Sequence, residues 1–113
     1  MGDRVLTEVF SLVKRSLRST DIVGRYGGEE FVILLPHTGV EAALQKVERI
    51  RQDIGSLVVQ AGVDKVSVTI SSGVAAPLEG GRTDSLDQLI ERADSALYEA
   101  KEAGRNRTII YKN

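Results

Sequence analysis

The sequence predicts an α+β fold in which helices pack on an antiparallel sheet. Three patterns support this prediction. Apolar residues recur at helical spacing in three segments, alternate with polar residues in residues 66–71, and flank the pair Gly27-Gly28 as two short runs. Helical spacing indicates amphipathic helices, alternation indicates a half-buried strand, and apolar runs around two glycines are typical of a hairpin.

The first half of the chain is predicted to form a helix, a hairpin and a second helix, over residues 3–18, 22–26 with 31–36, and 43–54. Asp3 lies near the start of the first helix, where an acidic side chain is favourable. Gly27 and Gly28 can supply the positive φ that a tight turn between strands requires. Pro36 ends the second strand, and Gly55 stops the second helix.

The second half is predicted to contain a short strand near Val58-Val59, a long strand over residues 66–71, a helix and a final strand over residues 108–111. The helix lies between Ser85, which with Gln88 resembles a capping box, and its C-terminal stop at Gly104.

Composition narrows the functional classes. The chain has 113 residues and 42% hydrophobic content, so residues 1–113 fit one small globular domain. Fifteen basic against sixteen acidic residues give a net charge of -1, which argues against nucleic acid as a partner. There is no cysteine, and no apolar run approaches the ~20 residues of a membrane span. These features predict a cytoplasmic setting and no membrane segment.

The tip of the predicted hairpin carries two adjacent carboxylates, Glu29 and Glu30, beside the two glycines. Hard cations such as Mg²⁺ take carboxylate oxygens and usually keep substrate phosphates as further ligands. The residues alone leave two interpretations open, a metal and phosphate site or a solvated hairpin tip.

Five segments resemble motifs of the GGDEF family of diguanylate cyclases. Residues 27–31 resemble the family signature in its GGEEF form. The other four are similar to GDxVL at residues 2–6, RxxD at residues 18–21, TxSxGVA at residues 69–75 and the last-helix motif at residues 98–106. The resemblance therefore covers nearly the whole chain.

The resemblance implies the palm-like fold of nucleotidyl cyclases, with residues 1–113 as a GGDEF domain that is incomplete at its N-terminus. Family members begin with a strand and a helix that would precede Met1, and that strand brings a metal-binding aspartate. The segment after it brings an asparagine that contacts guanine and part of the phosphate-binding loop. Because the absent strand is normally interior, we expect the sheet to close up or another chain to fill the gap.

The family condenses two GTP molecules to cyclic di-GMP, with one GTP held by each of two facing domains. The resemblance implies that Glu29 and Glu30 are catalytic residues and ligands of Mg²⁺ or Mn²⁺. The implied substrate-binding residues are Asp3, Gly27, Gly28, Lys101 and Arg105. Judged without the resemblance, Lys101 and Arg105 would complement a helix C-terminus, and Asp3 would cap a helix.

Arg18 and Asp21 resemble the family's product-inhibition motif, and Arg49 matches a further arginine that often completes that site. A guanidinium can pair with guanine O6 and N7 or with phosphate, while a carboxylate accepts from the other guanine edge. An exposed RxxD by itself is usually a solvated charge pair of little energetic weight. His37, the only histidine, is interpreted as a loop residue.

The sequence thus predicts a diguanylate cyclase domain with feedback inhibition by its product. Because parts of the metal and nucleotide sites are absent from residues 1–113, we expect this chain alone to bind cyclic di-GMP but to be catalytically impaired. A non-catalytic cyclic di-GMP receptor is the alternative, and a palm-like dimerisation module without a ligand is a third interpretation. We expect a homodimer or ligand-promoted self-association, with Arg18 near the contact.

Overall fold

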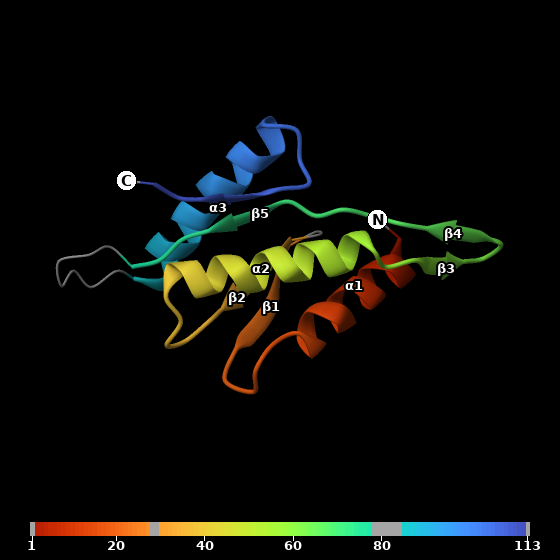
Figure 1. The fold of residues 1–113 in the computed structure, drawn as a ribbon, viewed down its shortest axis with the longest axis horizontal. Coiled ribbons are helices and arrows are strands. Elements are labelled where there is room, and N and C mark those ends of the chain that lie inside the picture. The colour runs from red at the N-terminus through yellow and green to blue at the C-terminus, as the bar shows by residue number, and fades with distance from the viewer. Residues whose placement is uncertain (1, 28–29, 78–84, 113) are drawn as a thin grey trace.

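The computed structural model describes residues 2–27, 30–77 and 85–112. Helices and strands alternate irregularly along these residues, as Figure 1 shows. The helices are α1 (Asp3–Arg15), α2 (Val40–Gly55) and α3 (Leu86–Glu102). The strands are β1 (Ile22–Gly27), β2 (Glu30–Leu34), β3 (Val59–Ala61), β4 (Asp64–Val66), β5 (Ser72–Val74) and β6 (Thr108–Ile110).

The described strands form three two-stranded sheets. β1 pairs with β2 and β3 with β4, both antiparallel, whereas β5 and β6 run parallel. A parallel pair requires a crossover connection, and α3 provides it between β5 and β6. The predicted α+β class is confirmed. The difference from the prediction is that the strands lie in three sheets, one of them parallel.

The long strand predicted over residues 66–71 is not formed, because residues 67–71 pair with none of the described strands. The ladder between β3 and β4 ends at the pair Val59 and Val66, since the chain before Val59 belongs to α2 and the turn after it. The ladder between β5 and β6 starts at Thr108, since the residues before it form the turn that ends α3. The segment between the two ladders therefore has no strand partner among residues 2–27, 30–77 and 85–112.

The ends of α1 and α2 differ from the prediction by a few residues. α1 ends at Arg15, where the Ser16 hydroxyl donates to the Leu12 carbonyl at 2.9 Å and closes the last turn. α2 begins at Val40, before the first predicted residue, and includes Gly55. None of the described helices has both the length and the apolar character that a membrane crossing needs.

α3 begins and ends with the motifs that the sequence predicts. Ser85 Oγ accepts from the Gln88 amide at 3.1 Å, and Gln88 Oε1 accepts from the Ser85 amide at 3.0 Å, which completes a capping box. Gly104 follows the helix with a φ of 118°, which glycine tolerates. The Arg105 amide donates to the Ala100 carbonyl at 2.9 Å, the long bond of a Schellman motif. Arg105 is thereby fixed just beyond the helix end.

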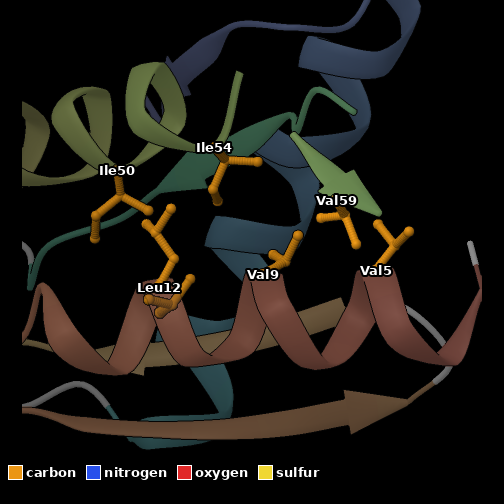
Figure 2. Packing of buried hydrophobic residues seen from close by; sticks show 7 residues of the cluster. Val5, Val9, Leu12, Ile50, Ile54 and Val59 are labelled. Carbon is orange, nitrogen blue, oxygen red and sulfur yellow. The ribbon is translucent and has the colours of Figure 1, made fainter. Parts of the chain in front are cut away.

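The main hydrophobic core lies between α1 and α2. Its buried residues are Val5, Val9, Leu12 and Val13 of α1, Ile50 and Ile54 of α2, and Val59 of β3. Figure 2 shows Leu12 and Val9 pointing toward Ile50 and Ile54 across the space between the helices. Spacings of three and four residues put the apolar residues of α1 on one stripe. Val9 and Ile54 are fully buried, and each such side chain stabilises the fold by roughly 1.5–3 kcal/mol.

α3 packs so closely on β5 that position 73 has no room for a side chain. A Cβ atom at Gly73 would lie 2.1 Å from the Ala93 carbonyl oxygen and 2.4 Å from the Leu97 amide nitrogen, both backbone atoms of α3. Ala96 and Ala100, which are buried, supply small side chains on the same helix. Glycine in β5 and alanines in α3 together permit this close approach.

We predict that Gly73→Ala destabilises the chain by about 2–3 kcal/mol, because the new methyl group overlaps helix backbone rather than a movable side chain. Chemical denaturation followed by circular dichroism measures the effect. Gly24→Ala in β1 is the matched control, since a Cβ there meets nothing within 4 Å and the φ lies outside the left-handed region. The control should change the free energy of unfolding by less than about 1 kcal/mol. Equal losses in the two variants would contradict the close-approach explanation.

Candidate functional site

The β1–β2 hairpin separates two groups of predicted site residues. In the antiparallel register, Ile22 pairs with Leu34 at one end and Gly27 pairs with Glu30 at the other. Residues 18–21 directly precede Ile22, whereas the predicted catalytic residues lie at the Gly27 end. The hairpin therefore has one predicted site at each end.

At the Gly27 end, Glu30 meets the last turn of α3. The Glu30 carboxylate Oε2 lies 3.7 Å from the Lys101 ammonium Nζ. Both side chains remain partly exposed, at 43% for Glu30 and 37% for Lys101. Two residues that are far apart in the sequence, and that are predicted for the same nucleotide site, are thus brought together.

The turn of this hairpin is described only in part, because Gly28 and Glu29 lie outside the described residues. Gly27 has a φ of 133°, so the positive φ predicted there is confirmed. Glu30 presents solvent-accessible carboxylate oxygens, the donors that Mg²⁺ and Mn²⁺ prefer. Glu30 therefore fits as one ligand of such a metal, although the described part of the chain contains no cluster of three acidic, histidine or cysteine side chains.

Asp3 and Arg105, two further predicted substrate-binding residues, have exposed side chains. Asp3 is the first residue of α1, and Gly2 rather than Asp3 takes the N-cap position. In Figures 1 and 2 the first turn of α1 lies on the same side of the molecule as the end of β1. Arg105 has a φ of 64° and lies beyond the end of α3. Neither side chain forms an ion pair with another described residue, so both are available to a ligand.

At the Ile22 end, Arg18 and Asp21 are joined by several hydrogen bonds. Asp21 Oδ2 accepts from the Arg18 amide at 2.8 Å and from Nε at 3.5 Å, and Oδ1 accepts from Nη2 at 3.3 Å. Arg18 Nη2 also donates to Thr38 Oγ1 at 2.7 Å and to the Pro36 carbonyl at 3.2 Å. The Arg18 side chain is still 52% exposed. One edge of the guanidinium is fixed to the protein while half of the side-chain surface stays open.

The Asp21 side chain has no exposed surface, because Arg18 and Lys46 cover it. Lys46 of α2 donates from Nζ to Oδ2 at 3.3 Å. Loss of water raises the pKa of Asp21, but hydrogen bonds from the Arg18 amide, the Arg18 guanidinium and Lys46 outweigh this, so the pKa lies below its ordinary value. The carboxylate holds both cations in place. Accepting a hydrogen bond from guanine, as the sequence predicts for Asp21, requires one of them to move.

Arg49 lies three residues after Lys46 on α2, and residues at this spacing share a helix face. Its side chain is exposed and pairs with no other described residue. The structure thus places Arg18 and Asp21 in direct contact and Arg49 one turn from their partner Lys46. Lys46 and Thr38 are two contact residues that the sequence motifs do not include. Helical spacing from Arg49 points to Lys46, whereas no local pattern points to Thr38.

Comparison with known protein families shows which family the chain belongs to. Residues 1–107 match the family model described as diguanylate cyclase, GGDEF domain. The chain belongs to the GGDEF domain family. The match spans nearly the whole chain, so the resemblance that the sequence motifs predict is confirmed.

The GGDEF domain is 42% identical to diguanylate cyclase A of Treponema denticola over 112 residues, which are 99% of this chain and 30% of that protein. It is similar to the structure of the active GGEEF domain of a diguanylate cyclase from Vibrio cholerae, with a TM-score of 0.82, 36% identity and coverage of 98% of this chain and 69% of that one. The GGDEF domain of DgcB from Caulobacter crescentus, in complex with c-di-GMP, gives a TM-score of 0.88 at 32% identity and covers 98% and 65%. These likenesses confirm the predicted cyclase fold, although the chain spans only 30%, 15% and 24% of three curated relatives.

Asp21 gives a pH-dependent prediction for this GGDEF domain. Because its folded-state pKa lies below its unfolded value, the ionised carboxylate stabilises the fold at pH values above the unfolded pKa, which is about 4. This stabilisation is lost as the pH falls through the folded-state pKa. The stability difference between wild type and Asp21→Asn should therefore be largest near neutrality and shrink on acidification. Melting temperatures over a pH series measure it, and a difference that stays constant would show that the substitution acts through packing alone.

Proposed function

We propose that the GGDEF domain of the full-length protein condenses two GTP molecules to cyclic di-GMP, and that residues 1–113 bind this product at Arg18, Asp21 and Arg49. The contact between Glu30 and Lys101 supports the first part, because it joins the signature hairpin to the last-helix motif. Identity of 42% to a diguanylate cyclase over 99% of the chain supports the same activity.

In this proposal the cations of the site bind phosphate and its carboxylates bind metal and guanine. Lys101 and Arg105 bind the β- and γ-phosphates of GTP through charge-assisted hydrogen bonds. Asp3 accepts hydrogen bonds from the guanine N1 and N2 groups. Glu29 and Glu30 provide oxygen ligands, and the ion pair with Lys101 keeps Glu30 beside the phosphates. When bound, Mg²⁺ or Mn²⁺ supplies neutralisation of the phosphate charge.

The reaction needs in-line positioning of two nucleotides rather than a covalent protein intermediate. Each domain holds one GTP, so two domains face each other as a homodimer. The 3′-hydroxyl of one GTP then attacks the α-phosphate of the other, the bond from the α-phosphorus to the β-phosphate oxygen breaks, and pyrophosphate and the hydroxyl proton are released. Gly27 and Gly28 have no side chain, which leaves room for the nucleotide beside the backbone.

We predict that the 113-residue chain alone makes little or no cyclic di-GMP from GTP and Mg²⁺. The family resemblance assigns a metal-binding aspartate and part of the phosphate loop to a segment that residues 1–113 do not contain. Chromatographic assay of the product measures turnover. The comparison is the same chain with the family's first strand and helix joined ahead of Met1, which should restore synthesis.

Lys101→Met in the extended chain should lower kcat/KM by roughly ten- to a hundredfold, the equivalent of one charge-assisted contact. Lys65→Met, at an exposed position in β4, is the matched control.

Strong synthesis by the 113-residue chain would contradict the predicted catalytic impairment of residues 1–113. Cyclic di-GMP binding without synthesis by the extended chain would instead support the non-catalytic receptor.

The charges of the proposed product site suit cyclic di-GMP. Arg18, Lys46 and Arg49 together with Asp21 leave two net positive charges, one for each phosphodiester of the ligand. Arg18 is half exposed and Arg49 is exposed, so both are open to a ligand. The similar domain of DgcB is in complex with c-di-GMP, which supports binding of this ligand.

We predict that Arg18→Ala weakens cyclic di-GMP binding by roughly ten- to a hundredfold, since it removes a charge-assisted contact. Isothermal titration calorimetry measures the dissociation constant. Arg4→Ala is the matched control, because Arg4 is an exposed arginine in the first turn of α1, at the opposite end of that helix. Unchanged affinity in Arg18→Ala would place the ligand elsewhere.

A further inference from the structure

The Arg18 guanidinium uses two of its three nitrogens on the protein itself. Nε donates to Asp21, and Nη2 is shared among Asp21, the Pro36 carbonyl and the Thr38 hydroxyl. The bond to Thr38 Oγ1, at 2.7 Å, is the shortest that this guanidinium makes in the described part of the chain. Nη1 has no hydrogen bond to another described residue and is left for a ligand.

Two of the three acceptors for Nη2 come from a turn between β2 and α2. His37 at its centre has a φ of 54°, a left-handed conformation that is uncommon for residues other than glycine. The Pro36 carbonyl and the Thr38 hydroxyl on either side both bond to the same nitrogen of Arg18. The Thr38 hydroxyl also donates to the Pro36 carbonyl at 3.0 Å, which fixes its orientation. The turn is therefore a preformed receptor for one edge of the guanidinium.

We propose that Thr38 is a positioning residue of the product site, which acts through Arg18. This inference rests on the proposed binding of cyclic di-GMP at Arg18. Arginine has a long side chain whose ordering costs conformational entropy when a ligand binds. Thr38 and the Pro36 carbonyl order Arg18 before binding, and they aim Nη1 outward because Nε and Nη2 are already engaged. Asp21 accepts from Nε and Nη2, and Thr38 and the Pro36 carbonyl accept from the same Nη2.

Calorimetric titration with cyclic di-GMP tests this role in a double-mutant cycle on the purified chain. Thr38→Val removes the hydroxyl at nearly constant volume and should weaken binding about three- to tenfold. Thr38→Ser restores the hydroxyl and should bind within about twofold of wild type. In the Arg18→Ala background, Thr38→Val should have no further effect beyond about twofold. Thr7→Val, at an exposed position of α1, is the matched control.

A second measurement does not depend on the ligand. Thr38→Val should speed exchange of the Arg18 Nε proton with water, as followed by NMR, because the guanidinium loses its shortest hydrogen bond and the bond from Nε to Asp21 is then less firmly held. Thr38→Ala gives the same comparison if the valine variant folds poorly.

Wild-type affinity in Thr38→Val, with weak binding in Arg18→Ala, would overturn the role of Thr38 and leave the product site intact. An equal loss from Thr38→Val with and without Arg18 would show that Thr38 acts independently of Arg18, which also overturns it. Absence of binding by the wild-type chain, or unchanged binding in Arg18→Ala, would overturn the product site and the role of Thr38 together.

Discussion

Packing of α1 against α2 is the contact on which the rest of the structure depends. The apolar stripe of α1 meets Ile50 and Ile54, and these buried side chains fix the two helices side by side (Figure 2). Residues 18–21 follow α1, and Lys46 lies one turn before Ile50 on α2. The helix packing therefore decides that Asp21 meets Lys46. Ion pairs near the protein surface contribute little free energy, so they do not determine how the two helices pack. The apolar packing of α1 on α2 instead positions Arg18, Asp21 and Lys46.

The β1–β2 hairpin is held along its length, and Val23, Phe31 and Ile33 pack against the hydrophobic core. A two-stranded hairpin is only marginally stable alone, so these attachments matter. Arg18 joins the start of β1 to the turn after β2, and Lys101 meets Glu30 at the other end. Between them, Phe31 packs on Phe10 of α1 with ring centroids 5.2 Å apart. Arg18 and Lys101 therefore contact opposite ends of the hairpin, and Phe31 contacts α1 between them.

Local patterns in the sequence predict the elements well, and pairing between distant elements is where prediction fails. The capping box at Ser85 and the stop at Gly104 depend only on near neighbours, and both are confirmed. Residues 66–71 alternate as a strand does, yet whether they join a sheet depends on partners that the local pattern does not contain. The candidate site follows the same division. Arg18 and Asp21 come from one motif, whereas Thr38 reaches Arg18 only because β1 and β2 bring the two ends of the hairpin together.

Residues 67–71 pair with none of the described strands, yet their side chains still alternate between the core and the surface. Val68 and Ile70 pack against the buried cluster, whereas Ser67 and Thr69 are exposed. Figure 1 shows this stretch as an extended link between β4 and β5. Alternate side chains of extended backbone point to opposite sides, so adding or deleting one residue here would turn the apolar pair toward solvent. Two residues could be gained or lost without that reversal, so the side-chain directions of this link tolerate length changes in even steps.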